Sequence, residues 1–233
     1  LQLNHKNISI MYMLFGIWSG MLGMSLSMMI RTELININNN FNFNNSYYSN
    51  ITIHALIMIF FMTMPIIIGS MSNWFIPLMI NSMDLIYPRM NNLSFWLLLP
   101  SLKIMLINMM IMNNINTGWT LYPPLITQNN ISINFIIFSI HINGLSSIMS
   151  SMNFIMTLMF LKSNFSSMMN INLFSWAIMI TSILLIFSIP VLASGITMIL
   201  TDINIKTMFF NPEGNGNPIM FQHIFWFFGH PEV

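Results

Sequence analysis

The segment 226–233, with the sequence WFFGHPEV, places a histidine and a carboxylic acid two positions apart around a proline. Each of these three residues is unfavourable in an apolar helix. Lipid disfavours the ionisable His230 and Glu232, and Pro231 removes the helix hydrogen bond to the carbonyl of Phe227. A structural hydrogen bond would explain Glu232 alone. A metal ligand at His230 beside a proton carrier at Glu232 explains the whole arrangement, and we predict that chemistry here.

The composition indicates that these groups lie in a membrane. Hydrophobic residues make up 55% of the 233 residues and charged residues only 5%, whereas a soluble domain carries about 25% charge. The net charge of +1 offers no basic surface for nucleic acid, and the absence of Cys excludes disulfides and thiolate metal sites. No basic n-region precedes an apolar segment, so we expect no signal peptide. The 27 Met residues and abundant Asn are typical of an AT-rich organellar gene.

The sequence contains six apolar runs. The first five reach the length of about 20 residues that a transmembrane helix needs, and the sixth stops at the last residue given. They cover about 8–30, 51–80, 93–112, 131–161, 173–200 and 218–233. We therefore expect an all-α, polytopic transmembrane helix bundle, with residues 1–233 as one transmembrane domain. Because the last run stops inside an apparent helix, we expect the chain to be part of a longer protein.

Basic residues predict the orientation of this bundle, because they favour the inner side of a membrane. With the N-terminus inside, Lys6, Arg89 and Lys162 lie in or beside inner loops. Arg31 and Lys206 then lie outside. The distribution favours the N-terminus on the inner side.

Three further ionisable residues lie at or near the outer ends of the first two spans. His54 is followed by an almost entirely apolar stretch. It can be a histidine hydrogen-bonded to a neighbouring helix, or an axial haem ligand in a dry pocket. Arg31 and Glu33 end the first span and can serve as an interfacial anchor, although an arginine at this depth can also bind a haem substituent.

A second group of polar residues begins with Asp84, in the loop after the second span. The flanking helices carry small polar side chains at Asn73, Asn91, Ser94, Ser146, Ser147 and Asn153. These can hold a water chain from a surface acid to a buried one, or they can be ordinary interhelical hydrogen bonds. Glu232 lies about 21 Å into the sixth span, near the middle of the membrane, where a carboxyl can hold and pass a proton.

These motifs resemble those of the haem–copper oxidase family. The segment 226–233 is similar to its copper-site motif, and the whole chain is similar to roughly the first half of subunit I of mitochondrial cytochrome c oxidases. Further matching stretches are 4–6 (NHK), 16–21 (GIWSGM), 54–55 (HA), 58–62 (MIFFM), 87–92 (YPRMNN), 118–120 (GWT) and 195–198 (GITM). Several long motifs in the right order make the resemblance specific.

The resemblance implies roles for the residues around the metal centres. His54 matches an axial ligand of the low-spin haem a, and Arg31 matches the arginine that binds the formyl group of that haem. His230 matches one of three histidine ligands of copper B, which lies beside haem a3. Trp119 matches an aromatic residue near the haem propionates, and Trp226 matches one beside copper.

The resemblance also implies a proton pathway, with Asp84 at its entrance and Glu232 at its end. The side chains between them are Asn73, Asn91, Tyr12, Ser94, Ser146, Ser147 and Asn153. Glu33 matches an acid linked to a peripheral Ca or Na site, and a Mg site would be completed by residues outside this sequence.

The implied function is that of a terminal respiratory oxidase in the inner mitochondrial membrane, with the N-terminus on the matrix side. Electrons from cytochrome c would pass through haem a to the haem a3–copper B pair, which reduces O2 to water while protons are pumped. Subunits II and III would be its partners in the lipid bilayer. The alternatives are a quinol oxidase of the same superfamily, a transporter or channel without a cofactor, and a non-functional nuclear copy.

Several residues depart from the family pattern. Ser72 stands where glycine is usual, and Ile203 stands where arginine is usual. Asn211 and Asn217 replace aspartates around a glycine-rich turn. Lys103 occupies a normally apolar position, and we place it early in the third span, with its side chain extended toward the inner surface.

Overall fold

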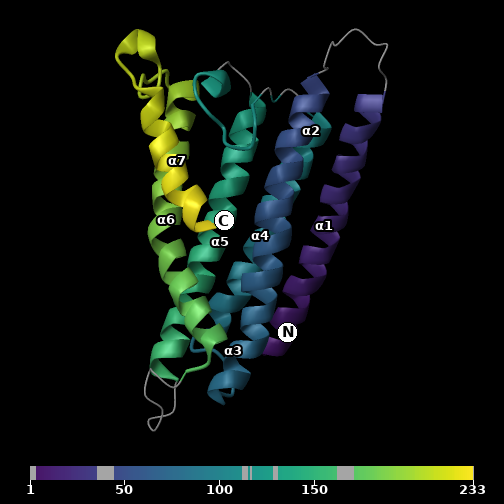
Figure 1. Cartoon of the computed structure of the whole chain (residues 1–233), viewed down its shortest axis with the longest axis vertical. Helices are drawn as coiled ribbons and strands as arrows, with labels where there is room; N and C mark the ends of the chain where they lie inside the picture. The colour runs from purple at the N-terminus through teal and green to yellow at the C-terminus, as the bar shows by residue number, and fades with distance from the viewer. Residues whose placement is uncertain are drawn as a thin grey trace.

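The computed structural model describes residues 4–35, 45–111, 115, 117–127, 131–161 and 171–232, and they form a bundle of long helices (Figure 1). In chain order the elements are α1 (His5–Ile35), α2 (Asn45–Leu56), η1 (Ile57–Thr63), η2 (Pro65–Met71), α3 (Ser72–Ile80), α4 (Pro88–Ile111), η3 (Leu125–Thr127), α5 (Ile131–Phe160), α6 (Leu173–Asn204), η5 (Pro212–Gly214) and α7 (Pro218–Glu232). Within these residues there is no strand, which confirms the all-α prediction.

Five helices in the described part of the chain are long and apolar enough to cross a membrane. They coincide with the first five predicted spans, and α2, η1, η2 and α3 together form the second of them. The sixth predicted span begins at Pro218 as α7. Large apolar side chains such as Leu14, Met24 and Phe187 are more than half exposed on the outside of the bundle, as lipid contact requires.

Successive spans run in opposite directions, so the connecting segments lie at the two ends of the bundle (Figure 1). Lys6 and Arg89 lie at the end where α1 begins, and Arg31 and Lys206 lie at the opposite end. This separation agrees with the predicted distribution of charge. Lys162 lies outside the described residues, and the side of the membrane that each end faces stays a prediction.

The second span is widened into a π-helix around Pro65. Proline has no N–H and its ring clashes with the carbonyl of the residue four positions earlier, here Phe61. Ser19 of α1 donates its hydroxyl to the Phe61 carbonyl at 2.6 Å. Asn143 of α5 donates to the neighbouring carbonyl of Phe60 at 3.1 Å. Side chains of two other helices therefore satisfy the backbone where the proline disturbs it, as a bilayer demands.

Glycines let α1 pack closely against this second span. A Cβ atom added to Gly16 would lie 2.4 Å from Ile66, and one added to Gly23 would lie 2.5 Å from the sulfur of Met58. Small residues spaced along one helix face are a common means of close helix contact in membranes. The close approach brings the backbone of α1 near the side chains of α2.

Three of the departures from the family pattern are accommodated locally. The hydroxyl of the fully buried Ser72 donates to the Ile67 carbonyl at 3.3 Å. Asn211 accepts a hydrogen bond from the backbone of Glu213, and Asn217 accepts one from the backbone of Ile219, where α7 begins. An asparagine oxygen can cap a turn as an aspartate does.

The predicted position of Lys103 was wrong. It lies 15 residues after Pro88 and 8 residues before Ile111, and so in the later half of α4. Lys103 is already near the middle of the predicted span 93–112, and α4 begins five residues before that span, at Pro88, because the first turn tolerates a proline.

Candidate functional site

A polar cluster lies at the end of the bundle where α1 begins. Asp84 is in the turn between α3 and α4, and its carboxylate lies 3.5 Å from Nδ1 of His5, the first residue of α1. His5 is 5% exposed, and its ring nitrogens have no aligned hydrogen-bond partner among the described residues. Sequence reasoning placed His5 at the interface without a role. The two residues are 79 positions apart, so no local signal could have paired them.

Two asparagines near this end are buried without satisfying their amide groups. Asn73 is 0% exposed and Asn91 is 1% exposed. Asn73 donates to the Gly69 carbonyl, but its Oδ1 has no partner, and neither polar atom of the Asn91 side chain has one in the described part of the chain. Unpaired buried amides are costly, and ordered water commonly satisfies them. The two side chains are therefore suited to bind internal water.

Asn153 behaves differently from these two asparagines. Its Nδ2 donates to the Tyr87 carbonyl at 3.2 Å, and its Oδ1 accepts from the Tyr87 N–H at 3.1 Å. This pair of bonds ties α5 to the segment that carries Asp84. Asn153 thus holds the turn in place.

A chain of hydroxyl groups crosses from α1 to α5 farther into the bundle. The Tyr12 hydroxyl lies 2.7 Å from the Ser94 hydroxyl, which in turn donates to the Asn91 carbonyl at 2.7 Å. Ser146 donates to the Ser94 carbonyl at 2.6 Å, and Ser150 donates to the Ser146 carbonyl at 3.1 Å. Sequence reasoning missed Ser150, which lies one helical turn after Ser146.

Tyr12, Ser146 and Ser150 of this chain border a small cavity of about 30 Å³. Its lining residues are Tyr12, Phe60, Met64, Pro65, Ile68, Gly69, Leu98, Asn143, Ser146, Ser147 and Ser150. A cavity of this size has room for a water molecule, and the Ser and Asn side chains in its lining offer polar partners. It lies along the line that leads from the asparagines toward the bundle interior.

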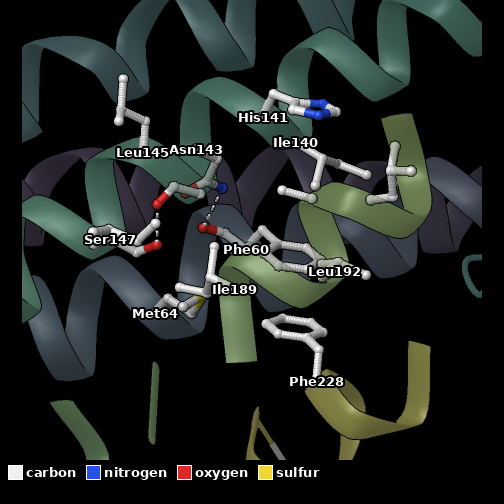
Figure 2. A pocket seen from close by; sticks show the side chains of 14 residues that line it. Phe60, Met64, Ile140, His141, Asn143, Leu145, Ser147, Ile189, Leu192 and Phe228 are labelled. Atoms are coloured by element: carbon white, nitrogen blue, oxygen red, sulfur yellow. Dashed lines mark hydrogen bonds between the residues drawn. The ribbon is translucent and has the colours of Figure 1, made fainter. Parts of the chain in front are cut away.

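Figure 2 shows the residues that line a larger cavity of about 300 Å³. The two cavities share Phe60, Met64, Asn143 and Ser147 in their linings. The rest of the larger lining is almost entirely apolar and comes from α5, α6 and α7, including Phe228, whose ring stacks on Phe60 at 5.9 Å. Apolar cavities of this kind stay dry and accept small apolar molecules.

His54 has the geometry of a neutral metal ligand. Its Nδ1 lies 2.8 Å from the carbonyl oxygen of Gly23, and because a carbonyl only accepts, Nδ1 carries the proton. In the neutral imidazole Nε2 then keeps a free lone pair, and Nε2 has no hydrogen-bond partner within the described residues. A backbone carbonyl that orients the other ring nitrogen is a usual second contact of a metal-binding histidine. The side chain fits an axial haem ligand.

The other predicted cofactor residues lie apart from one another. Arg31 and Glu33 are exposed in the last turns of α1 and form no ion pair with any described residue. Trp119 contacts the ring of Phe225 on α7, with 5.3 Å between centroids. Trp226 is 48% exposed on α7.

His230 is exposed on α7, and the side chain of Glu232 lies outside what the structure describes. Within the described ranges no three His, Asp or Glu side chains are grouped so that they could hold a metal ion. The copper assignment of His230, the proton assignment of Glu232 and the cation assignment of Glu33 all stay predictions.

Comparison with known proteins decides the family. A family model described as "Cytochrome C and Quinol oxidase polypeptide I" matches residues 7–233. The chain belongs to this family. It is 40% identical over 235 aligned positions to cytochrome c oxidase subunit 1 of Eremothecium gossypii, covering 99% of the chain and 44% of that protein. It is 44% identical to cytochrome c oxidase subunit 1 of Mytilus edulis, covering 99% of the chain and 42% of that protein.

The chain therefore spans less than half the length of these two curated relatives. Membership of the polypeptide I family confirms the resemblance that the motifs indicated. It accounts for an arrangement in which a histidine with a free Nε2 and a line of buried polar groups lie in one helical membrane bundle.

Proposed function

We propose that the chain forms part of the catalytic subunit of a respiratory oxidase that reduces O2 to water with electrons from cytochrome c. The observation that carries this proposal is the half-buried His54, whose Nδ1–H binds the Gly23 carbonyl and whose Nε2 is free. His54 would hold the iron of haem a, Arg31 would bind the formyl group of that haem, and Trp119 would contact its propionates. His230 would be one ligand of copper B, the metal that acts with haem a3, and Trp226 would contact that site.

Protons for this reaction enter at Asp84 and are held at Glu232. When bound, the haem a3–copper B pair supplies the electrons and the position at which O2 is reduced. Water held by the unpaired amides of Asn73 and Asn91 carries protons inward from Asp84. The hydroxyl groups of Tyr12 and Ser94 continue this line at 2.7 Å from each other.

The proposed proton route ends at the side chains that separate the small cavity from the larger one. Ser146 extends the hydroxyl chain, and Ser147 and Asn143 border both cavities. The apolar lining of the larger cavity is suited to O2, which is itself apolar, and excludes the water that would short-circuit proton transfer. Proton and oxygen thus approach α7 by separate routes.

The proposal extends to location and assembly. The chain, as one transmembrane domain over residues 1–233, lies in the inner mitochondrial membrane with its N-terminus on the matrix side. Subunits II and III and cytochrome c are its partners, and Glu33 contributes to a peripheral Ca or Na site. A Mg site would be completed by other residues.

The test is an optical and kinetic measurement on the intact oxidase complex purified from its native membrane. We expect the reduced spectrum of haem a, two haems and one copper B for each complex, and O2 uptake driven by reduced cytochrome c. Uptake driven by a quinol alone would instead favour the quinol oxidase. A colourless preparation without copper would refute the proposal and favour a transporter or channel.

Gly69→Ala is expected to disturb the proton line. A Cβ atom at Gly69 would lie 2.4 Å from the Tyr12 ring, so the ring must move away and its bond to Ser94 must lengthen. Overpacking of this kind costs about 1–3 kcal/mol of stability. We expect proton uptake, followed with a pH indicator during single turnover, to slow at least about tenfold.

Gly118→Ala is the matched control for this substitution. No described atom lies within 4 Å of a Cβ added at Gly118, so the same change should leave proton uptake unaltered. Equal rates for the two variants would show that the position of the Tyr12 ring does not matter.

A further inference from the structure

Lys103 is a charged residue on the outer surface of a membrane span. It is exposed on α4, and its ammonium makes no ion pair with a described residue. The exposed side chains along the same face are otherwise large and apolar, namely Leu93, Trp96, Leu99 and Met110. An ammonium surrounded by hydrocarbon is strongly unfavourable and rare.

The depth of Lys103 prevents its charge from reaching water easily. At about 1.5 Å per residue, its Cα lies about 22 Å from Pro88 and about 12 Å from Ile111 along a helix of 24 residues. The hydrocarbon core is about 30 Å thick. The Cα–Cβ bond tilts toward the N-terminus of the helix, and so toward the more distant end. The four-carbon stem must therefore reverse direction to extend toward the nearer surface.

We propose that the Lys103 face of α4 docks a transmembrane helix of a separate polypeptide that carries an aspartate or glutamate at the same depth. The carboxylate neutralises the ammonium, and the flanking apolar residues pack against the partner helix. Lipid phosphates lie at the membrane surface, so one could neutralise the ammonium only if the stem reversed direction toward the nearer end of α4.

The packing order of the helices favours a separate polypeptide over the remainder of this one. Residues that complete the sites of His230 and Trp226 must approach α7, which packs on α6. α4 packs mainly on α5, whereas α7 packs mainly on α6 and, through the ring of Phe228, on Phe60 of the second span. The Lys103 face lies apart from these contacts, because its side chains are exposed. This inference concerns assembly and does not depend on the proposed chemistry.

The test is a zero-length crosslink in the intact complex within its native membrane. A membrane-permeant carbodiimide joins an amine and a carboxyl in contact, and mass spectrometry identifies the linked peptides. We expect an amide bond between Nζ of Lys103 and an acidic residue in a transmembrane segment of another subunit. A link to the subunit's own carboxyl, or an unlinked Lys103, would overturn the proposal.

Variants of Lys103 provide an independent readout, the amount of the linked subunit that remains after detergent extraction. Lys103→Arg keeps the charge and should retain it, whereas Lys103→Glu should lose it about tenfold, the size of an intramembrane polar contact. Lys206→Glu, an exposed lysine outside the spans, is the matched control and should retain it.

Lys103→Met is a second test that still applies if the charge reversal in Lys103→Glu prevents folding, because methionine removes the charge and keeps an apolar side chain. Its haem spectrum should be unchanged while retention of the linked subunit falls. Equal retention in Lys103→Met and the unmodified complex would overturn the proposal. A colourless complex that still shows the Lys103 crosslink would refute the proposed function alone.

Discussion

His54→Ala is expected to remove haem a from the intact complex and to lower the total haem absorbance by about half. Alanine supplies no nitrogen for the iron, and no other described histidine lies beside the Gly23 carbonyl that orients His54. Electron entry from cytochrome c should then stop, because haem a is the proposed relay. The measurement is the reduced spectrum together with the haem and copper content of the purified complex.

The control for this variant is His223→Ala. His223 is also a histidine in an apolar segment, but it is exposed near the start of α7. We expect both haems to remain in this variant. A normal spectrum in His54→Ala would show that His54 is only a packing residue, as the alternative interpretation of its sequence context allowed.

Glu232→Gln is expected to block proton delivery while leaving haem a in place. Glutamine has nearly the same shape as glutamic acid and keeps its hydrogen bonds, but it cannot release and regain a proton at the pH of the membrane surfaces. Loss of a group that transfers protons typically slows a reaction by 10²–10⁴-fold, so turnover should fall at least about a hundredfold. Steady-state O2 uptake and the haem spectrum, recorded on the same sample, check both halves of this expectation.

Glu213→Gln is the corresponding control. Glu213 is exposed in the turn η5, outside the spans, and the same loss of charge there should not change turnover. Normal O2 uptake in Glu232→Gln would contradict the assigned role of this carboxyl. A decrease in both variants would point to a general effect of charge on assembly.

The spans and the class of the fold were predictable from local sequence. Long apolar runs must form helices in a bilayer, because lipid offers no partner for backbone N–H and C=O groups. The predicted span 131–161 therefore agrees with α5 to within one residue. The start of α4 was predicted less well, because polar residues and a proline can occupy the first turn of a membrane helix.

The candidate residues were predictable only one by one. The apolar run that follows His54 indicated this residue as a candidate. Its contact with the Gly23 carbonyl could not be predicted, because the two residues are 31 positions apart and lie on different helices. Asp84 was assigned as an entrance without its neighbour His5. Asn153 was placed in the proton line, whereas the structure shows its amide engaged with the backbone of Tyr87.

The sequence by itself determined that the chain is a helical membrane protein with costly polar groups inside it, because hydropathy and charge act through composition and local spacing. Only the tertiary structure decided which of those groups meet. The rotation and axial register of each helix depend on packing between distant segments, such as the close approach of α1 to the second span at Gly23. That packing leaves Nε2 of His54 free and leaves Lys103 unpaired on the outer face of α4.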